Sequence, residues 1–337
     1  MATSFASFRY ISIVSAALAG VSASAAASPV PGTSCPTFPA DTWWHADVSG
    51  LPVHPKSAAW LSRMSPDRNL HPDFGPSFGE QPVPYGIPIT VVGGGHAKVR
   101  VQFQYDDESN DIPYPLGNDT KVEGGQYRTG DRHTVIVDKS TCRLYETWAT
   151  ARSNGSWQAG SGANWKLDSY FLRDAGDTSA DAAGLPILPL LLRFDEVAAG
   201  EVDHAIRFTT DTTDRRYLWP ARHQAGSVSN QNFPPMGARF RLKASYKIKP
   251  GLRAGTKTVL QAMKKYGLVL ADNGSPWFFQ GTSDTRWSAA LIEELKGIPA
   301  SAFEAVDTSP LMVTRNSMRV KEFSPNDPAN ESTELNP

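Results

Sequence analysis

The segment RFDEVAAGEVDHAIRF, residues 193–208, concentrates side chains that are suited to proton transfer. Its ionisable members within ten positions are Asp195, Glu196, Glu201, Asp203 and His204. Carboxylates beside an imidazole suit acid–base cleavage of a glycosidic bond, because one group must donate a proton while another accepts one.

Two interpretations of this segment are open. Read as a strand, residues 202–209 place His204 on the apolar face and Asp203 beside Arg207 on the other face. His204 is then a hydrogen-bonded core histidine, and the acidic residues decorate a turn around Gly200. Alternatively the turn folds over a cleft, and Glu196 or Glu201 supplies the partner that a buried imidazole needs.

A second cluster, RRYLWPARH, spans residues 215–223. Tyr217 and Trp219 share one strand face, where they either stack on a sugar ring or fill the core. Arg222 and His223 follow Pro220, at a strand end, and loop residues there often carry function on a rigid scaffold. Trp277 is a further aromatic candidate for stacking on sugar.

A third cluster, ARFRLKASY, places Arg239, Arg241 and Lys243 on one strand face. This face is either solvated or lines a groove for an anionic polymer such as a polyuronate. In the groove, an arginine would neutralise the substrate carboxylate while His204, His223 or Tyr217 removes the α-proton. That chemistry is β-elimination by a polysaccharide lyase.

Other catalytic and metal-binding patterns are weak. His133 and Glu146 are a candidate pair across the segment HTVIVDKSTCRLYETW, whose register the sequence leaves open. The seven histidines show no HxH or HExxH spacing, and the chain has no P-loop or GxGxxG pattern. We expect no cofactor except a structural Ca²⁺ held by YDDESND, residues 105–111, which lacks the spacing of an EF-hand.

The elements that must position these residues are mostly short strands. The 26 Pro and 27 Gly favour frequent turns. Alternation and apolar runs predict strands over 87–92, 98–105, 133–148 (a hairpin), 185–194, 202–209, 215–220 and 239–246. Helical spacing predicts helices over 55–64, 253–267 and 287–297. The fold class is all-β, a β-sandwich of jelly-roll type with a few peripheral helices.

The chain ends indicate export. Residues 1–27 are typical of a signal peptide, with Arg9, a short apolar run and small residues for cleavage near Ala25 or Ala27. Residues 28–322 are expected to form one domain with a Pro/Gly-rich N-terminal extension (28–86), and 323–337 a disordered tail. In an oxidising compartment Cys35 and Cys142 are expected to form a disulfide.

The segments GLPILPLLLRFDEVAAGEVDHAIRFTT, YLWPARH, PPMGARFRLKAS and MKKYGLVLADNGS resemble a family of secreted microbial proteins. The resemblance spans nearly the whole chain after residue 40 and implies an exported protein with a sandwich-like core. It assigns no activity to any residue. A net charge of −1 disfavours nucleic acid as a partner, and no segment predicts insertion into a membrane.

Together these patterns predict a secreted protein that cleaves an extracellular polysaccharide, with hydrolysis favoured over elimination. The alternative is a non-catalytic protein that binds sugar or the cell wall. The candidate catalytic residues are Glu196, Glu201, Asp203, His204, Arg222 and His223. The candidate substrate-binding residues are Tyr217, Trp219, Arg239, Arg241 and Trp277.

Overall fold

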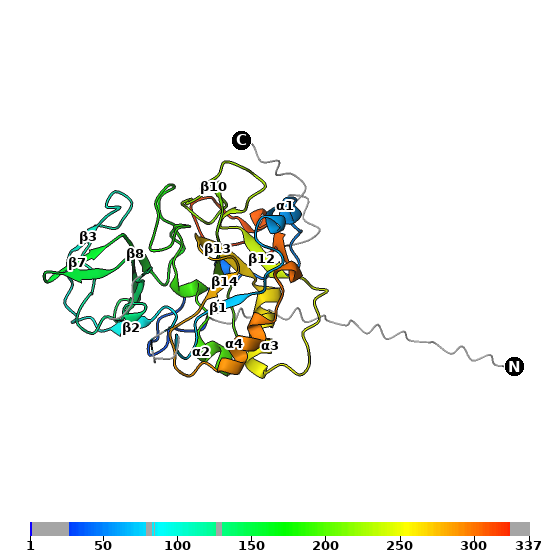
Figure 1. The fold of residues 1–337 in the computed structure, drawn as a ribbon, viewed down its shortest axis with the longest axis horizontal. Helices are drawn as coiled ribbons and strands as arrows, with labels where there is room; N and C mark the ends of the chain where they lie inside the picture. Colours follow the sequence, from blue (N-terminus) through cyan, green and yellow to red (C-terminus); the bar gives the residue numbers. More distant parts are fainter. Residues whose placement is uncertain (2–26, 79–82, 84, 126–129, 324–337) are drawn as a thin grey trace.

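The computed structural model describes Met1 and residues 27–78, 83, 85–125 and 130–323 (Figure 1). Residues 2–26 of the predicted signal peptide and 324–337 of the predicted tail lie outside this part. No helix within the described ranges is long and apolar enough to cross a bilayer.

The larger lobe is built on a six-stranded mixed sheet. Its order is β1 (His71–Asp73), β14 (Phe278–Gln280), β9 (Ile206–Thr210), β13 (Leu268–Asn273), β12 (Arg239–Leu242) and β15 (Phe303–Val306). The β1–β14 and β9–β13 pairs are parallel, and the other neighbours are antiparallel. A two-stranded parallel ribbon, β10 (Asp214–Tyr217) and β11 (Pro235–Met236), lies in the same lobe (Figure 1).

Helices lie at the periphery of this lobe. Figure 1 shows α2 (Phe194–Ala199), α4 (Ala289–Lys296) and α3 (Ala254–Lys265) together below the sheet, and α1 (Ser57–Ser62) packs against β15. The described residues also form four short 3-10 helices, namely η1 (Trp43–His45), η3 (Leu188–Leu190), η4 (Ala300–Ala302) and η5 (Ser309–Leu311).

The smaller lobe contains two sheets. One has the order β2 (Ile89–Val92), β4 (Thr134–Asp138), β5 (Arg143–Trp148) and β8 (Ser161–Lys166), and the other β3 (Val101–Phe103), β7 (Ser156–Ala159) and β6 (Ala151–Ser153). Val135 and Val137 of β4 join the core shared with the larger lobe, whereas Ile136 packs with Tyr114 and Trp157 in a second cluster. Because β4 is covered on both faces, it reads as a continuous apolar run.

The all-β, sandwich-like class with peripheral helices is confirmed. The hairpin over 133–148 is confirmed as β4 and β5, and the helices over 253–267 and 287–297 are confirmed as α3 and α4. Gly267 follows α3 with φ of 76°, a conformation that favours glycine.

Five predicted strands are wrong in extent or type. The strand predicted over 98–105 is only Val101–Phe103, and the one predicted over 215–220 ends at Tyr217. Residues 188–190 form η3 instead of a strand, because Pro189 cannot donate to a ladder and its fixed φ suits a helical turn. Residues 194–199 form α2. The strand predicted over 202–209 begins only at Ile206, as β9. The strand predicted over 239–246 ends at Leu242.

The predicted disulfide between Cys35 and Cys142 is confirmed, and it closes a loop with a sequence separation of 107 residues. Replacing both cysteines with alanine is expected to lower the free energy of unfolding by about 2–4 kcal/mol, because the unfolded chain regains loop entropy. Denaturant titration measures the change, and reduction of the unaltered protein should reproduce it. Equal midpoints for the oxidised and cysteine-free proteins would contradict this prediction.

Candidate active site between the two lobes

Glu196 and His204 do lie together, but in the protein interior. Glu196 Oε2 is 3.1 Å from His204 Nε2, and both side chains are 1% exposed. The Arg193 Nη2 atom lies 2.5 Å from Glu196 Oε1 and is also buried. Burial alone lowers the pKa of His204, but the Glu196 carboxylate outweighs it and the pKa lies above its usual range. The group is a closed ionic network that no polysaccharide chain can enter in this structure.

The other acidic residues of that segment are spread out. Glu201 and Asp195 are exposed on opposite ends of α2. Asp203 accepts a hydrogen bond from the backbone N–H of Ser28 at 3.0 Å. Glu196, Asp203 and His204 could each offer one ligand atom to a metal ion, and these atoms lie within 4.8 Å of one another. Among the described residues this is the one group of that kind. In the acidic loop, Glu108 instead accepts the Thr178 N–H, so calcium there stays a prediction.

The three candidate arginines are buried against backbone carbonyls. Arg222 donates to the carbonyl of Arg315, and Arg239 to the carbonyl of Trp43. Arg241 donates to the carbonyls of Val48, Ser49 and Leu51 and pairs with Glu304. The face that carries Arg239 and Arg241 is therefore neither solvated nor an open groove. It binds backbone carbonyls of residues 43–51.

The candidate aromatics also serve packing. Trp277 is fully buried, stacks on Phe208 and donates its Nε1–H to the Met64 carbonyl. Trp219 is half-buried and donates its Nε1–H to the Ser317 carbonyl. Tyr217 is half-buried beside the core. A ring that packs on both faces cannot also stack on a sugar, and this excludes Trp277 from that role in the observed conformation.

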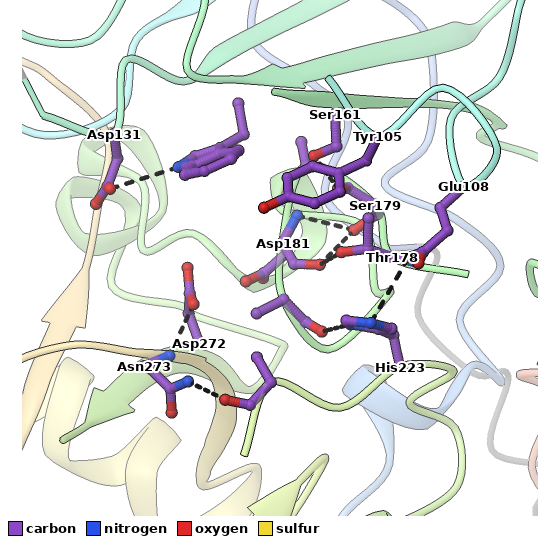
Figure 2. Close-up of a pocket in the computed structure, with 14 residues that line it drawn as sticks. Tyr105, Glu108, Asp131, Ser161, Thr178, Ser179, Asp181, His223, Asp272 and Asn273 are labelled. Carbon is purple, nitrogen blue, oxygen red and sulfur yellow. Dashed lines mark hydrogen bonds and ion pairs between the residues drawn. The ribbon is translucent and has the colours of Figure 1, made fainter. Parts of the chain in front are cut away.

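Among the candidate residues, His223 lines an open pocket (Figure 2). This pocket of about 380 Å³ lies between the lobes. A second pocket of about 260 Å³ shares three of its residues, Asp131, Asp272 and Asn273. We call the two pockets together the carboxylate cleft.

A β-bulge places Asp272 in the carboxylate cleft. In the parallel β9–β13 pair, Leu270 lies opposite Phe208 but Asp272 lies opposite Thr209, so that Ala271 is the extra residue. Without it, Asp272 would fall opposite Thr210 and on the other sheet face. The bulge therefore brings Asp272 to the face that carries Arg207.

Three charged groups meet at this point. Arg207 forms a bidentate pair with Asp181, from Nε at 3.1 Å and from Nη2 at 2.8 Å. The same Nη2 atom is 3.8 Å from Asp272 Oδ2, so the carboxylates of Asp181 and Asp272 both lie beside one nitrogen of Arg207. Burial first and Asp181 second raise the pKa of Asp272 to about 7, although Arg207 opposes them. Near neutral pH, Asp272 can therefore either donate or accept a proton.

Asp131 lies on the opposite wall, just before β4. It is exposed, and its charge contributes to the raised pKa of Asp272. Figure 2 shows Asp131, Asp181 and Asp272 pointing toward the same space. The indole Nε1 of Trp148 lies 3.4 Å from Asp131 Oδ1. A substrate between the walls would thus meet a carboxyl group on each side.

Two aromatic side chains form one wall of the cleft. The rings of Tyr105 and Trp148 lie 6.4 Å apart at 32°, and Tyr105 is 43% exposed. Gly160 lies under the indole, because a Cβ there would come within 2.2 Å of a Trp148 ring carbon. The exposed Tyr105 ring and the half-buried Trp148 ring, tilted toward each other, could hold the apolar face of a sugar.

The floor of the cleft holds polar atoms without partners. His133 Nδ1 is 2.7 Å from Glu123 Oε2, while His133 Nε2 is buried and, within the described residues, has no hydrogen-bond partner. Gln280 Oε1 is in the same state in the same pocket. Buried polar atoms normally find a partner, so these two favour a bound hydroxyl or water.

Glu146 lies opposite Val135 in the hairpin and not opposite His133. It is fully buried and accepts the N–H groups of Ile187 and Leu188. Burial raises the pKa of Glu146 from 4.5 to about 7. Its contribution to stability is therefore complete below pH 4.5 and is lost as the pH rises through 7, where ionisation costs on the order of 3 kcal/mol.

We expect Glu146→Gln to remove this dependence. The unfolding free energy of the unaltered protein should fall relative to Glu146→Gln between pH 4.5 and 7, as measured by urea titration at each pH. The surface substitution Glu293→Gln is the matched control and should leave the pH profile unchanged. A constant difference between Glu146→Gln and the unaltered protein across this range would contradict the prediction.

Sequence patterns did not reveal the main residues of the cleft. Asp131 and Asp181 lie in loops, and Asp272 occurs in the segment LADNGS, whose alternation does not reveal a bulge.

Comparisons of this chain with protein-family models, with curated proteins and with solved structures gave no match.

Proposed function

We propose that the protein is an exported enzyme that hydrolyses an extracellular polysaccharide in the carboxylate cleft. The observation that carries this proposal is the Asp272 carboxyl group, whose pKa is raised to about 7, in an open cleft opposite Asp131. General acids work best when their pKa lies near the working pH.

In the proposed reaction, protonated Asp272 donates its proton to the glycosidic oxygen as the bond from that oxygen to the anomeric carbon breaks. A water molecule supplies the hydroxyl group to the anomeric carbon, and Asp131 accepts the proton of that water. Arg207, held by Asp181, keeps the Asp272 side chain in place. Tyr105 and Trp148 would bind the neighbouring sugar unit.

Export is supported by the signal-peptide pattern of residues 1–27 and by the Cys35–Cys142 disulfide. The proposed kinship with secreted microbial proteins agrees with it. Hydrolysis is favoured over elimination because Arg239 and Arg241 are occupied by backbone carbonyls, while the cleft presents carboxylates.

A non-catalytic sugar-binding function is the second candidate, and the ring pair of Tyr105 and Trp148 favours it. Such a protein would use the same wall of the cleft but would cut nothing. The two candidates therefore share a binding site and differ in the role of Asp272.

A panel of neutral glucans and polyuronates tests the proposal. We expect new reducing ends from one polymer without the ultraviolet absorbance of an unsaturated uronate, whose appearance would indicate a lyase. Affinity electrophoresis should show retardation that Gly160→Ala weakens, because its Cβ would displace the Trp148 ring. Gly95→Ala, at a glycine with open space around it and no positive φ, controls for glycine replacement. Retardation without cleavage would support the sugar-binding function alone. The absence of both retardation and cleavage would refute both proposed functions.

A further inference from the structure

The N-terminal segment is anchored at Ser28. Its backbone N–H donates to Asp203 Oδ2 at 3.0 Å, and its carbonyl accepts the Thr37 hydroxyl at 2.8 Å. Val30, two residues on, is fully buried and donates its N–H to the carbonyl of Cys35 at 2.9 Å. The Ser28 nitrogen therefore has a fixed place beside the Asp203 carboxylate.

Asp203 has bonding capacity left at this place. Its Oδ1 atom is buried and, in the part of the chain that the structure describes, has no hydrogen-bond partner. The nearest cationic candidate is His45 Nδ1 at 3.7 Å, which already lies 2.8 Å from the Asp203 carbonyl oxygen. A carboxylate accepts several hydrogen bonds, so one N–H leaves this group incompletely satisfied.

The neighbouring cationic side chains make their contacts with Glu196. Glu196 and Asp203 are two carboxylates, and Arg193 places its guanidinium on Glu196. Burial lowers the pKa of His45, so its imidazole is neutral at neutral pH. The His204 imidazole also pairs with Glu196. A positive charge beside Asp203 would give this carboxylate a direct ionic partner.

The sequence before Ser28 indicates the source of that charge. Residues 25–27 are all alanine, the small-residue pattern after which leader peptidases cut. We propose that a leader peptidase hydrolyses the Ala27–Ser28 bond and that the new α-ammonium group of Ser28 forms an ion pair with Asp203. This ion pair fixes the mature N-terminus on the β9 side of the protein.

The chemistry of the step balances. Water adds its hydroxyl group to the Ala27 carbonyl carbon and a proton to the Ser28 nitrogen, and the C–N bond breaks. The free amine takes a second proton from solvent, since α-amino groups have a pKa of about 7.7–8.0. The ammonium group then has three N–H donors, enough to keep Asp203 Oδ2 and to reach Oδ1.

The inference rests on the export that forms part of the proposed function, but it is independent of any activity in the carboxylate cleft. Secretion of the full precursor, followed by intact mass measurement and N-terminal sequencing, tests the cleavage. We expect a mature chain that begins with an unblocked Ser28. A chain that begins at Ala26 or at any other residue would overturn the proposal.

A double-mutant cycle tests the ion pair. Retaining Ala27 moves the ammonium group one residue away, and we expect the Tm to fall by about 2–4 °C. In the Asp203→Asn background the same extension should have no effect. Asp168→Asn, which alters a carboxylate that is 64% exposed, should keep the full shift. Equal shifts with and without Asp203 would refute the ion pair.

A measurement on the unaltered mature chain remains decisive if Asp203→Asn does not fold. The ion pair should raise the pKa of the α-amine by about one unit and slow its acylation about tenfold relative to the urea-unfolded protein. Peptide mapping after brief acylation gives both rates. Equal rates in the folded and unfolded chains would show that the Ser28 amine is not held by Asp203.

Discussion

Replacing Asp272 with asparagine is expected to reduce the rate of polysaccharide hydrolysis by about 10²–10⁴-fold, the usual contribution of a general acid. Asparagine has nearly the same shape but cannot donate the proton that leaves with the glycosidic oxygen. Activity of the unaltered enzyme should also decline as the pH rises through about 7, because Asp272 then ionises.

Steady-state rates measured across pH for both proteins check this prediction. Asp168→Asn serves as the matched control because Asp168 is an exposed carboxylate outside the cleft. Its rates and pH profile should equal those of the unaltered enzyme. Full activity of a folded Asp272→Asn protein would exclude Asp272 as the acid and would move attention to other groups in the cleft.

Replacing Arg207 with methionine is expected to lower the free energy of unfolding by about 3–5 kcal/mol. Asp181 has a side chain that is 0% exposed, and Arg207 is its bidentate partner. Without Arg207, Asp181 remains as an unpaired buried charge. Denaturant titration measures this loss, and the Asp181→Leu change in the same chain should restore part of it because both charges are then gone.

Arg100→Met is the control for this experiment. Arg100 pairs with Asp111 at 3.0 Å, but the two side chains are 76% and 77% exposed. Water screens such pairs, so the substitution should cost at most about 1 kcal/mol. If Arg207→Met lowered the free energy of unfolding by no more than Arg100→Met does, the Asp181–Arg207 pair would add little to stability.

The sequence predicted best what depends on neighbouring residues. The period of residues 253–267 needs only one apolar face, and the turn between β4 and β5 joins strands that are adjacent in the chain. Sheet order depends on distant segments, such as the pairing of β1 with β14. No local pattern contains that information.

The candidate site shows the same division. His204 is buried, and its partner is Glu196, one of the two candidates, Glu196 and Glu201, that the sequence offered. Counting cations on residues 239–246 could not distinguish water from the backbone carbonyls that Arg239 and Arg241 bind. One inserted residue, Ala271, decides whether Asp272 faces the cleft, and a bulge leaves no mark in hydrophobic periodicity.

The large sheet takes its strands from nearly the whole length of the chain. Strand β1 begins at His71, whereas β15, which covers the edge of β12, ends only at Val306. A chain that stops before Phe303 leaves the N–H and C=O groups on one side of the buried strand β12 unpaired. Incomplete chains, on the ribosome or after proteolysis, would therefore present a template for aggregation until the last strand arrives.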